Sequence, residues 1–270
     1  MYQGFYNLAS GMLTQSRNLN VISNNMVNIQ TAGYKRDKMV STTFQEEMLY
    51  RTGKRYKDNP EPMATTSKIR AADQTYVNYE QGSFEETEGI YDFALAGRGF
   101  FCIDTPQGVR YTRNGSFSVD DEGYLTLNGM GRVQGAGGQP ILIDSEEFSV
   151  DGQGRITLPQ GVLGNAVAAD AENDGEEGGA TREIAALRVV DFDNYEQLHK
   201  EDYGLFSTNQ APLEVERPEI LWKTLERSNV DMVEEMTSMM SSQRALQSAA
   251  QVLKMYDQIM SKAATDVGRL

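Results

Sequence analysis

Residues 5–29 read FYNLASGMLTQSRNLNVISNNMVNI, and this stretch decides the class of fold at the N-terminal end. Two series of positions, mostly apolar, recur every seven residues within it. They are Phe5, Met12, Leu19 and Met26, and Leu8, Gln15, Ile22 and Ile29. A seven-residue apolar repeat predicts a helix that packs against another helix. We expect this helix to end at Thr31-Ala32-Gly33, because Gly33 can take the left-handed conformation of a C-cap.

The same repeat returns at the other end of the chain. One series comprises Met232, Met239, Leu246, Leu253, Met260 and Val267, and the other comprises Met236, Gln243, Ala250, Asp257 and Ala264. Further apolar residues beside these series make the apolar face wider than a two-stranded coiled coil needs. The sequence therefore predicts a long C-terminal helix that contacts several neighbours. Ser228-Asn229 is the predicted N-terminal cap of that helix.

Between the two helices the apolar period changes to two. Short apolar or alternating runs, separated by Gly, Asp and Asn, predict β-hairpins. These runs are residues 100–103, 109–112, 141–143 and 187–190. An internal repeat supports this interpretation, because residues 117–127 and 148–158 are identical at seven of eleven positions and each predicts two strands around an Asp/Gly turn. The predicted fold class is α+β, with a mainly-β central domain of hairpins and long terminal helices that pair like a coiled coil.

The composition also predicts where the domains begin and end. We expect residues 1–35 and 225–270 to form a helical inner domain, residues 36–80 an extended linker or loop region, and residues 81–224 a β-rich outer domain. Two segments lack an apolar period and predict exposed, mobile loops. They are the polar, basic residues 50–75 and the acidic, glycine-rich residues 170–179.

The charge of the chain excludes some partners. The 25 basic and 39 acidic residues give a net charge of -14, which disfavours binding to nucleic acid or to an anionic lipid surface. No apolar stretch approaches the roughly 18 residues of a membrane span, so we expect no membrane insertion. The first 16 residues hold neither a charged nor a continuous apolar segment, and we expect no cleaved secretory signal.

Candidate chemical sites are few. The single cysteine, Cys102, cannot form an intramolecular disulfide, and the single histidine, His199, cannot form a histidine cluster for a metal. His199 has no accompanying nucleophile motif. The glycines at 97–99 and 129–135 lack the Lys-Ser/Thr of a phosphate loop and predict turns.

Acidic groups give no stronger signal. Asp120-Asp121-Glu122 and the acidic run around Asp174 do not match a calcium-binding loop. We therefore expect no catalytic, cofactor or metal site, although two distant carboxylates could still meet to form a hydrolase site.

Several groups of residues resemble the bacterial flagellar rod and hook family of axial proteins. They are ISNNMVN at 22–28 with TAGYK at 31–35, DFALAGRGFF at 92–101, YTRNGSF at 111–117 with GYL at 123–125, and LERSNV at 225–230 with QRA at 243–245. They stand in the family's order, and the resemblance covers nearly the whole chain. Residues 105–115 and the chain length are most like the proximal-rod member of the family, with the distal-rod member second.

The resemblance implies a structural subunit without catalytic activity. The terminal helices of many copies, together with other rod and hook proteins, would pack into an inner tube that transmits torque from motor to hook. The β domain would face outward. The resemblance further implies export through the flagellar type III apparatus without a cleaved signal, and a location in the basal body within the cell envelope.

The helical repeats and the family motifs together predict the residues that pack between subunits. They are Phe5, Leu8, Met12, Leu19, Ile22, Asn24, Asn25, Met26, Asn28, Ile29, Gly33, Asn229, Met232, Met236, Met239, Leu246, Ala250, Leu253 and Met260. Arg17 is the only charged residue before residue 35, which suits an interface because unpaired charges are costly to bury. The alternative from a different class is an envelope glycan-binding or hydrolytic β-domain protein whose helices only dimerise.

Overall fold

The computed structural model describes residues 2–43, 46–51, 61–67, 70–127, 129–143, 145, 147–158 and 182–267. Contacts divide the chain into two compact units. We call Met1–Val27, Arg36–Asn78 and Val230–Leu270 the helical unit, and Asn28–Lys35 and Tyr79–Asn229 the β-rich unit. The order of elements is a helix, a long series of strands and a second helix, so the predicted α+β class is confirmed.

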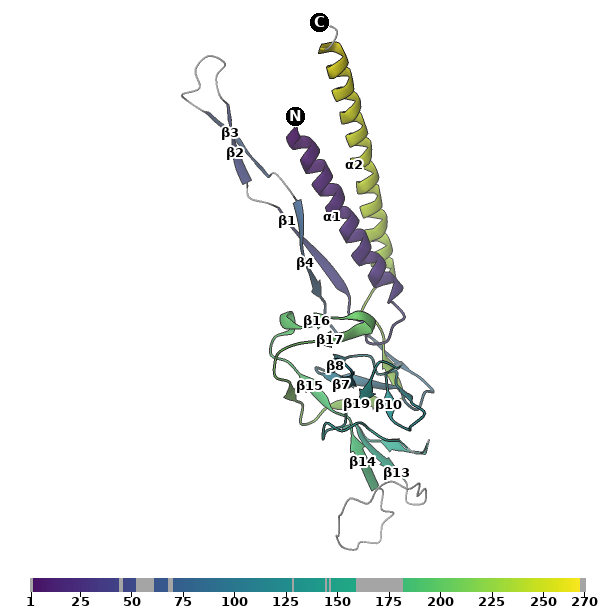
Figure 1. Ribbon diagram of the computed structural model, residues 1–270. Helices are drawn as coiled ribbons and strands as arrows, with labels where there is room; N and C mark the ends of the chain where they lie inside the picture. The colour runs from purple at the N-terminus through teal and green to yellow at the C-terminus, as the bar shows by residue number, and fades with distance from the viewer. Residues whose placement is uncertain are drawn as a thin grey trace. The chain divides into compact units, whose positions relative to one another are not determined.

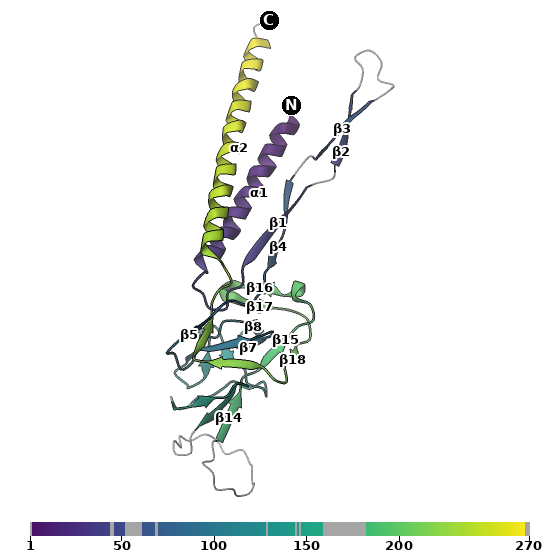
Figure 2. The same ribbon diagram turned by 180° about the vertical axis from the view of Figure 1, so that it is seen from behind.

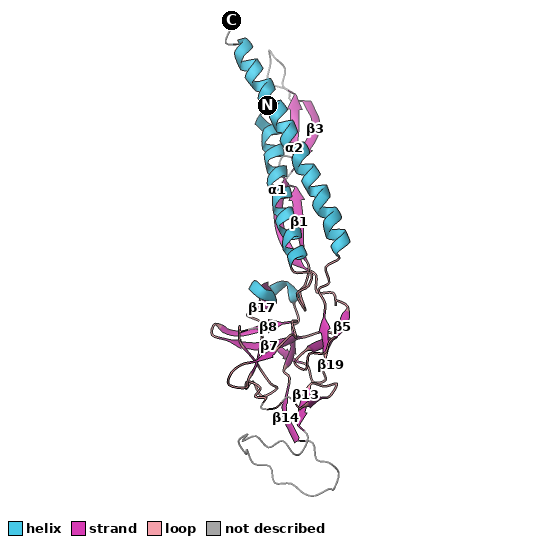
Figure 3. Ribbon diagram, turned by 90° about the vertical axis from the view of Figure 1, so that its right-hand side faces the viewer, coloured by secondary structure: helices cyan, strands magenta, loops and turns pink. Residues whose placement is uncertain are grey.

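The helical unit is built on two antiparallel helices, α1 (Tyr2–Val27) and α2 (Met232–Val267). They lie side by side, with the N-terminus of α1 and the C-terminus of α2 at the same end (Figures 1 and 2). At 1.5 Å per residue they are about 39 and 54 Å long, so α2 extends past the start of α1. Four strands complete the unit, and the β1·β4 ribbon runs along α1 (Figure 3). They are β1 (Asp37–Thr43), β2 (Glu46–Arg51), β3 (Glu61–Ser67) and β4 (Arg70–Val77), with β1 paired to β4 and β2 to β3.

The strands of the helical unit differ from the loop predicted at residues 50–75. The described part of this segment pairs as antiparallel strands, and its β-branched residues Thr65, Thr66 and Thr75 favour extended structure. Pro62 is accommodated opposite Tyr50, at the place where the β2·β3 register shifts. Charge and proline content alone therefore misled the prediction. Residues 52–60, and the whole acidic segment 170–179, lie outside the described residues.

The β-rich unit is organised around one large antiparallel sheet. Its strand order is β16-β17-β8-β7-β11-β10-β9, and β15 pairs with both β7 and β18. The bounds are β7 (Phe100–Thr105), β8 (Gly108–Thr112), β9 (Ser118–Val119), β10 (Leu125–Thr126), β11 (Arg132–Val133), β15 (Val189–Asp191), β16 (His199–Lys200), β17 (Leu205–Ser207) and β18 (Leu213–Glu214). His199 is exposed on the short strand β16.

Smaller sheets and two turns of 3₁₀ helix accompany the large sheet. Strands β12, β13 and β14 form a three-stranded sheet, while β19 pairs with β6 and β20 with β5. Their bounds are β5 (Phe84–Glu86), β6 (Phe93–Ala96), β12 (Ser149–Val150), β13 (Arg155–Leu158), β14 (Arg182–Ala186), β19 (Glu219–Trp222), β20 (Thr224–Glu226), η1 (Tyr195–Gln197) and η2 (Asp202–Gly204).

The core of the β-rich unit comes from the alternating residues of these strands. Phe93, Phe101, Ile103 and Leu125 are fully buried in it. Cys102 is also buried, and burial raises the pKa of its thiol to about 12. The predicted hairpin runs at 100–103 and 109–112 are confirmed as the adjacent strands β7 and β8.

The predicted internal repeat is confirmed in the pattern of hydrogen bonds. In the first copy, the Asp120 carboxylate accepts hydrogen bonds from the amides of Glu122 and Tyr124, at 3.0 and 2.8 Å. In the second copy, the Asp151 carboxylate accepts from the amides two and four residues later, at 2.9 and 3.0 Å. Gly123 and Gly154 each follow the turn with positive φ, at 88° and 78°. Each copy is a two-stranded hairpin, β9·β10 or β12·β13.

The predicted end of α1 is wrong. The helix ends at Val27, and Gly33 lies in the β-rich unit. Gly33 does have positive φ, at 67°, but its amide donates to the carbonyl of Glu226 at 2.7 Å instead of closing the helix. A Cβ at Gly33 would lie 2.3 Å from the backbone of Arg113. This glycine is therefore required by close backbone approach.

The predicted cap of α2 is also wrong. The Asp231 carboxylate accepts hydrogen bonds from the amides of Val233 and Glu234, at 2.8 and 3.4 Å, so Asp231 is the capping residue. Asn229 donates its side-chain amide to the carbonyl of Glu80 at 2.9 Å, within the β-rich unit. The long-range partner Glu80 is invisible to a local sequence pattern.

Candidate functional site on the terminal helices

The face that α2 turns inward follows a seven-residue repeat, but only partly the predicted one. Of the predicted first series, Met239, Leu246, Leu253 and Met260 are half-buried, whereas Met232 is 47% exposed. The second inward series is Glu235, Ser242, Ala249 and Tyr256, one residue before the predicted positions. Of the predicted second series, Ala250 is half-buried, whereas Met236 is 43% exposed.

Hydrogen bonds explain why polar residues occupy the inward face. Ser242 is 6% exposed and accepts a hydrogen bond from the Asn18 amide of α1 at 3.1 Å. Glu235 is 1% exposed, and its carboxylate accepts a hydrogen bond from the side-chain amide of Asn25, which also lies on α1. Polar groups can be buried when they are paired, and an apolar pattern cannot detect such positions.

The packing residues predicted from the N-terminal repeat and motif fall into four groups. Ile22 and Asn25 are buried, and the half-buried residues on the same helix are Leu8, Met12, Leu19 and Met26. Phe5 and Asn24 are exposed. The remaining three, Asn28, Ile29 and Gly33, belong to the β-rich unit. The structure therefore brings most of the α1 set together on one face and separates the residues after the helix from it.

Asn25 joins three elements of the helical unit. Its side-chain amide donates to the Asp37 carbonyl at 2.8 Å, and its oxygen accepts from the Asp37 amide at 2.9 Å, as a neighbouring β-strand would. The same amide also donates to the Glu235 carboxylate at 3.3 Å. One buried side chain thus ties α1 to the start of β1 and to the start of α2.

Arg36, the residue immediately before β1, strengthens this joint. Its guanidinium donates two hydrogen bonds to the Glu234 carboxylate, at 2.9 and 3.0 Å, and its Nε lies 2.6 Å from the Glu235 carboxylate. The hydrogen bonds to Glu234 raise the pKa of Arg36, and the same bonds lower the pKa of Glu234. The bidentate geometry gives this pair a fixed orientation.

A second charged cluster holds the segment after α1 within the β-rich unit. The Lys35 ammonium donates to the Glu226 carboxylate at 2.6 Å and to the Glu80 carbonyl at 2.9 Å. Arg113 contacts the other carboxylate oxygen at 3.5 Å. Lys35 and Glu226 are 2% and 1% exposed. Burial lowers the pKa of both Lys35 and Arg113, and Glu226 opposes that effect.

The two helices leave many large apolar side chains exposed. Those on α1 are Phe5, Tyr6, Leu13 and Val27, and those on α2 are Met232, Val233, Met236, Met240, Val252, Met255 and Ile259. Their exposed fractions run from 36% for Phe5 to 77% for Val27. Single exposed apolar residues are ordinary, but a set that follows two adjacent helices marks an interaction surface.

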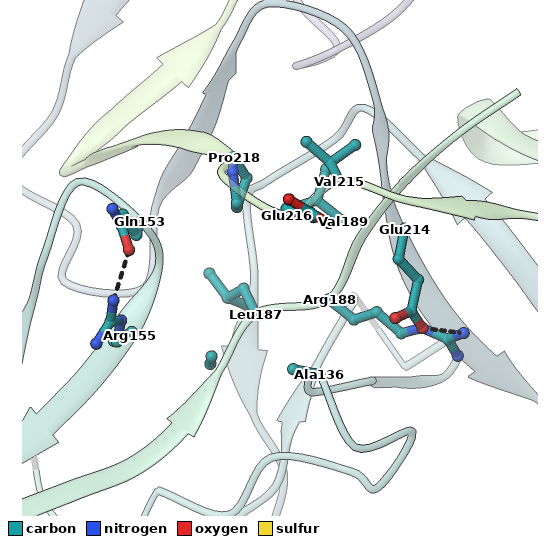
Figure 4. A pocket seen from close by; sticks show the side chains of 11 residues that line it. Ala136, Gln153, Arg155, Leu187, Arg188, Val189, Glu214, Val215, Glu216 and Pro218 are labelled. Carbon is teal, nitrogen blue, oxygen red and sulfur yellow. Dashed lines mark hydrogen bonds and ion pairs between the residues drawn. The ribbon is translucent and has the colours of Figure 1, made fainter.

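The β-rich unit offers a less suitable site. A cavity of about 180 Å³ lies in this unit, and there Arg188 pairs with Glu214 at 3.0 Å and Arg155 donates to Gln153 at 2.6 Å. Figure 4 shows the side chains that line it. Both arginine side chains drawn there are thus already engaged by neighbouring residues. Among the residues that the structure describes, no group of three or more His, Cys, Asp or Glu side chains could hold a metal ion. No helix in the described ranges is long and apolar enough to span a membrane.

Family models match the chain in three places, which together cover more than half of it. The family described as "Flagella basal body rod protein" matches residues 5–35. "Flagellar hook protein FlgE/F/G D1 domain" matches residues 94–175, and "Flagellar basal body rod FlgEFG protein C-terminal" matches residues 223–266. The first and last of these matches contain most of α1 and α2.

Full-length relatives agree with these matches. The flagellar basal-body rod protein FlgF of Caulobacter vibrioides is 29% identical, over 97% of this chain and 96% of its own. The rod protein FlgG of Bacillus subtilis is 27% identical, over 97% of this chain and 98% of its own. FlgG of Buchnera aphidicola is 27% identical over 94% of this chain and 95% of its own.

The chain therefore belongs to the bacterial flagellar rod and hook family of axial proteins. Its function is that of a structural subunit of the flagellar basal-body rod, which agrees with the interpretation of the sequence motifs.

Proposed function

We propose that this subunit assembles with copies of itself, and with other axial proteins, through the faces of α1 and α2 that its own fold leaves uncovered. The observation that carries the proposal is the set of exposed apolar side chains along both helices. Burial of apolar area stabilises association, at about 25 cal/mol per Å² removed from water. Helices from several subunits would then form the inner tube of the rod.

The division of labour along the chain follows from this proposal. The polymerising part is α1 with α2, within the ranges 1–35 and 225–270 predicted from sequence. Residues 28–35 and 225–229 pack in the β-rich unit, so within these ranges we assign the main contacts between subunits to α1 and α2. Residues 36–80 form the extended connection, and residues 81–224 are the outer domain.

Torque transmission is the mechanical role we assign to the assembled helices. A rod that turns must resist the sliding of its elements, and the polar joint around Asn25 and Arg36 fixes α1, β1 and α2 to one another. Apolar contacts between subunits would carry the load from one copy to the next.

Position and route complete the proposal. We place the subunit in the proximal part of the rod within the cell envelope, exported by the flagellar type III apparatus without a cleaved signal. Family membership supports this placement. The relatives named FlgF and FlgG are about equally identical to this chain, so a distal-rod or hook-type position is the alternative. Determining the order of the proteins along isolated rods would distinguish the two positions.

The test introduces a charge on the exposed face of α1. Leu13 is 57% exposed, so Leu13→Asp should leave the subunit folded, yet place an unpaired charge in the proposed interface. The readouts are co-sedimentation of the purified full chain with isolated rods, and swimming of cells that carry only the variant. Both should be lost.

The control makes the same charge change elsewhere. Gln107 is exposed in the turn between β7 and β8, so Gln107→Asp should keep both readouts at the wild-type level. Normal rods and swimming in the Leu13→Asp strain would overturn the proposal.

A further inference from the structure

Among the residues whose side chains the structure describes, the exposed methionines are confined to one helix. Of the methionine side chains that the structure describes, four are exposed, and all four lie on α2. They are Met232, Met236, Met240 and Met255, with 47%, 43%, 52% and 55% of their surface exposed. The other described methionines are half-buried, including Met239, the immediate neighbour of Met240.

The four residues share one side of α2. Met232, Met236 and Met240 follow one another at intervals of four residues, which places them on a common face. Met255 comes fifteen residues after Met240, which places it about 60° farther round the helix, so the four residues lie within less than half of the helix circumference. The set, which we call the methionine stripe, spans about 35 Å of helix at 1.5 Å per residue.

The stripe differs from the inward face chiefly in exposure, because the two methionines of the inward series, Met239 and Met260, are half-buried. Leu246 and Leu253 supply two of the half-buried contacts on the inward side, and their side chains hold no oxidisable atom. The thioether of methionine is polarisable and adaptable in packing, and it is also open to oxidation wherever its sulfur is accessible. The surface that we assign to assembly is thus the surface most open to oxidation.

We propose that the methionine stripe is an oxidative modification site that blocks assembly of the free subunit. The proposal rests on the function proposed above, because it acts on the same face of α2. Hydrogen peroxide is the oxidant. A sulfur lone pair attacks one peroxide oxygen, the O–O bond breaks, and the released hydroxide takes up the proton to leave as water. The thioether becomes a sulfoxide through a two-electron oxidation, and the peroxide is reduced.

The sulfoxide changes what the face can bury. Its oxygen is a strong acceptor, and an acceptor without a donor is costly in an apolar interface. With four such groups along the helix, the oxidised face no longer fits apolar side chains of a neighbouring subunit. Once the subunit is in the rod, burial of the stripe slows the reaction. Methionine sulfoxide reductases reverse the modification.

The first measurement maps oxidation by mass spectrometry after brief exposure of the purified full chain to hydrogen peroxide. The matched internal comparison is Met240 against Met239, since the two are adjacent in sequence. We expect the four stripe residues to react about threefold or more faster than Met239 and Met260, and to lose this advantage in isolated rods. Equal rates at Met239 and Met240 in the free chain would overturn the proposal.

The second measurement asks whether oxidation blocks assembly. The oxidised chain should co-sediment with isolated rods at least about tenfold less than the untreated chain, and treatment with the reductases should restore it. A variant with all four stripe residues replaced by leucine keeps the apolar face and lacks the sulfurs. It should co-sediment equally before and after treatment with peroxide. The single variant Met240→Leu is a smaller change, and its helical circular dichroism should equal that of the wild type if leucine is tolerated on this face.

The outcomes separate this inference from the proposed function. If the peroxide-treated leucine variant loses co-sedimentation as the wild type does, oxidation elsewhere is responsible and the inference is wrong. If the oxidised wild type assembles normally while Leu13→Asp does not, the inference is wrong and the proposed function stands. If Leu13→Asp assembles normally, the proposed function fails and the inference fails with it.

Discussion

The β-rich unit and the helical unit treat their large apolar side chains in opposite ways. Sixteen residues form a common buried core in the β-rich unit. Among the described residues of the helical unit, the buried apolar side chains are only Ile22 and Val230. The β-rich unit therefore buries a large apolar core within one chain, whereas the helical unit leaves many of its large apolar side chains exposed to solvent.

In their buried polar contacts, however, the two units are alike. Each unit contains a cluster of buried charged or amide groups, around Glu226 in the β-rich unit and around Glu235 in the helical unit. The segments joined by these clusters are far apart in sequence, since Lys35 and Glu226 are separated by 191 residues. Paired buried charges give orientation to segments that apolar burial alone would leave free to shift. Removing single members of each cluster tests how far each unit depends on it.

The largest effect is expected from Glu226→Gln. The variant leaves Lys35 and Arg113 buried without a carboxylate, and removal of one partner of a buried ion pair costs about 3–5 kcal/mol of the free energy of unfolding. Cys102 measures opening of the β-rich unit, because its buried thiol, with a pKa raised to about 12, reacts with alkylating reagents only after exposure. Its rate of alkylation should rise by two orders of magnitude or more.

Glu85→Gln is the matched control for this change. Glu85 is 60% exposed and lies 3.5 Å from Arg227, so the substitution should cost less than about 1 kcal/mol. The role assigned to Glu226 is wrong if the two variants alkylate Cys102 at the same rate.

Asn25→Ala should have a smaller effect, confined to the helical unit. It removes both hydrogen bonds to the Asp37 backbone, at a cost of about 1–3 kcal/mol of the free energy of unfolding. Loss of helical circular dichroism on heating should begin at a lower temperature, while fluorescence of the single tryptophan, Trp222 in the β-rich unit, should change little.

Ser23→Ala provides the comparison for Asn25→Ala, since Ser23 is exposed on the same helix. It should change the free energy of unfolding by less than about 0.5 kcal/mol, and so leave the thermal transition nearly unchanged. If the transition followed by Trp222 fluorescence moves to lower temperature as much as the transition followed by helical circular dichroism in Asn25→Ala, the two units do not unfold independently.

The sequence could predict the elements that depend on local repetition. The seven-residue spacing of Phe5, Met12, Leu19 and Met26 predicted α1, and the repeated Asp/Gly turns predicted both hairpins at residues 117–127 and 148–158. In each case the signal lies within a few residues of the structure it specifies, so neighbouring positions suffice.

Features that depend on distant partners could not be predicted. Gly33 carried the local signature of a helix cap, yet it serves a close approach to Arg113, far away in sequence. Asn229 had the composition of a cap, yet it binds Glu80. The polar residues Glu235 and Ser242 occupy the inward face of α2 because Asn25 and Asn18 meet them there, and no apolar pattern could identify them.

The candidate site shows the same division between local and distant information. The sequence predicted that both helices would pack, and the family motifs pointed to contacts between subunits. It could not separate residues that pack within the chain, such as Ile22, from residues left exposed, such as Met236, because both satisfy the seven-residue repeat. The separation depends on how α1 and α2 meet, and we propose that Met236 and its exposed neighbours serve the contacts between subunits.

The smallest effect is expected at Glu234, and its sign depends on pH. Hydrogen bonds from Arg36 lower the pKa of this carboxyl below its ordinary value of 4.5. A carboxyl whose pKa is lowered by folding adds stability above its unfolded pKa and loses that contribution as pH falls through the folded value. Because Glu234 is 57% exposed, the pair should contribute less than about 1 kcal/mol. Thermal unfolding of Glu234→Gln should therefore begin slightly earlier than that of the wild type at pH 7, and the two should converge in acid. If the unfolding temperatures of Glu234→Gln and the wild type still differ at pH 2, Glu234 acts through packing or through its hydrogen bonds as a neutral group. The charge of the Arg36 pair would then have no part in holding the helical unit together.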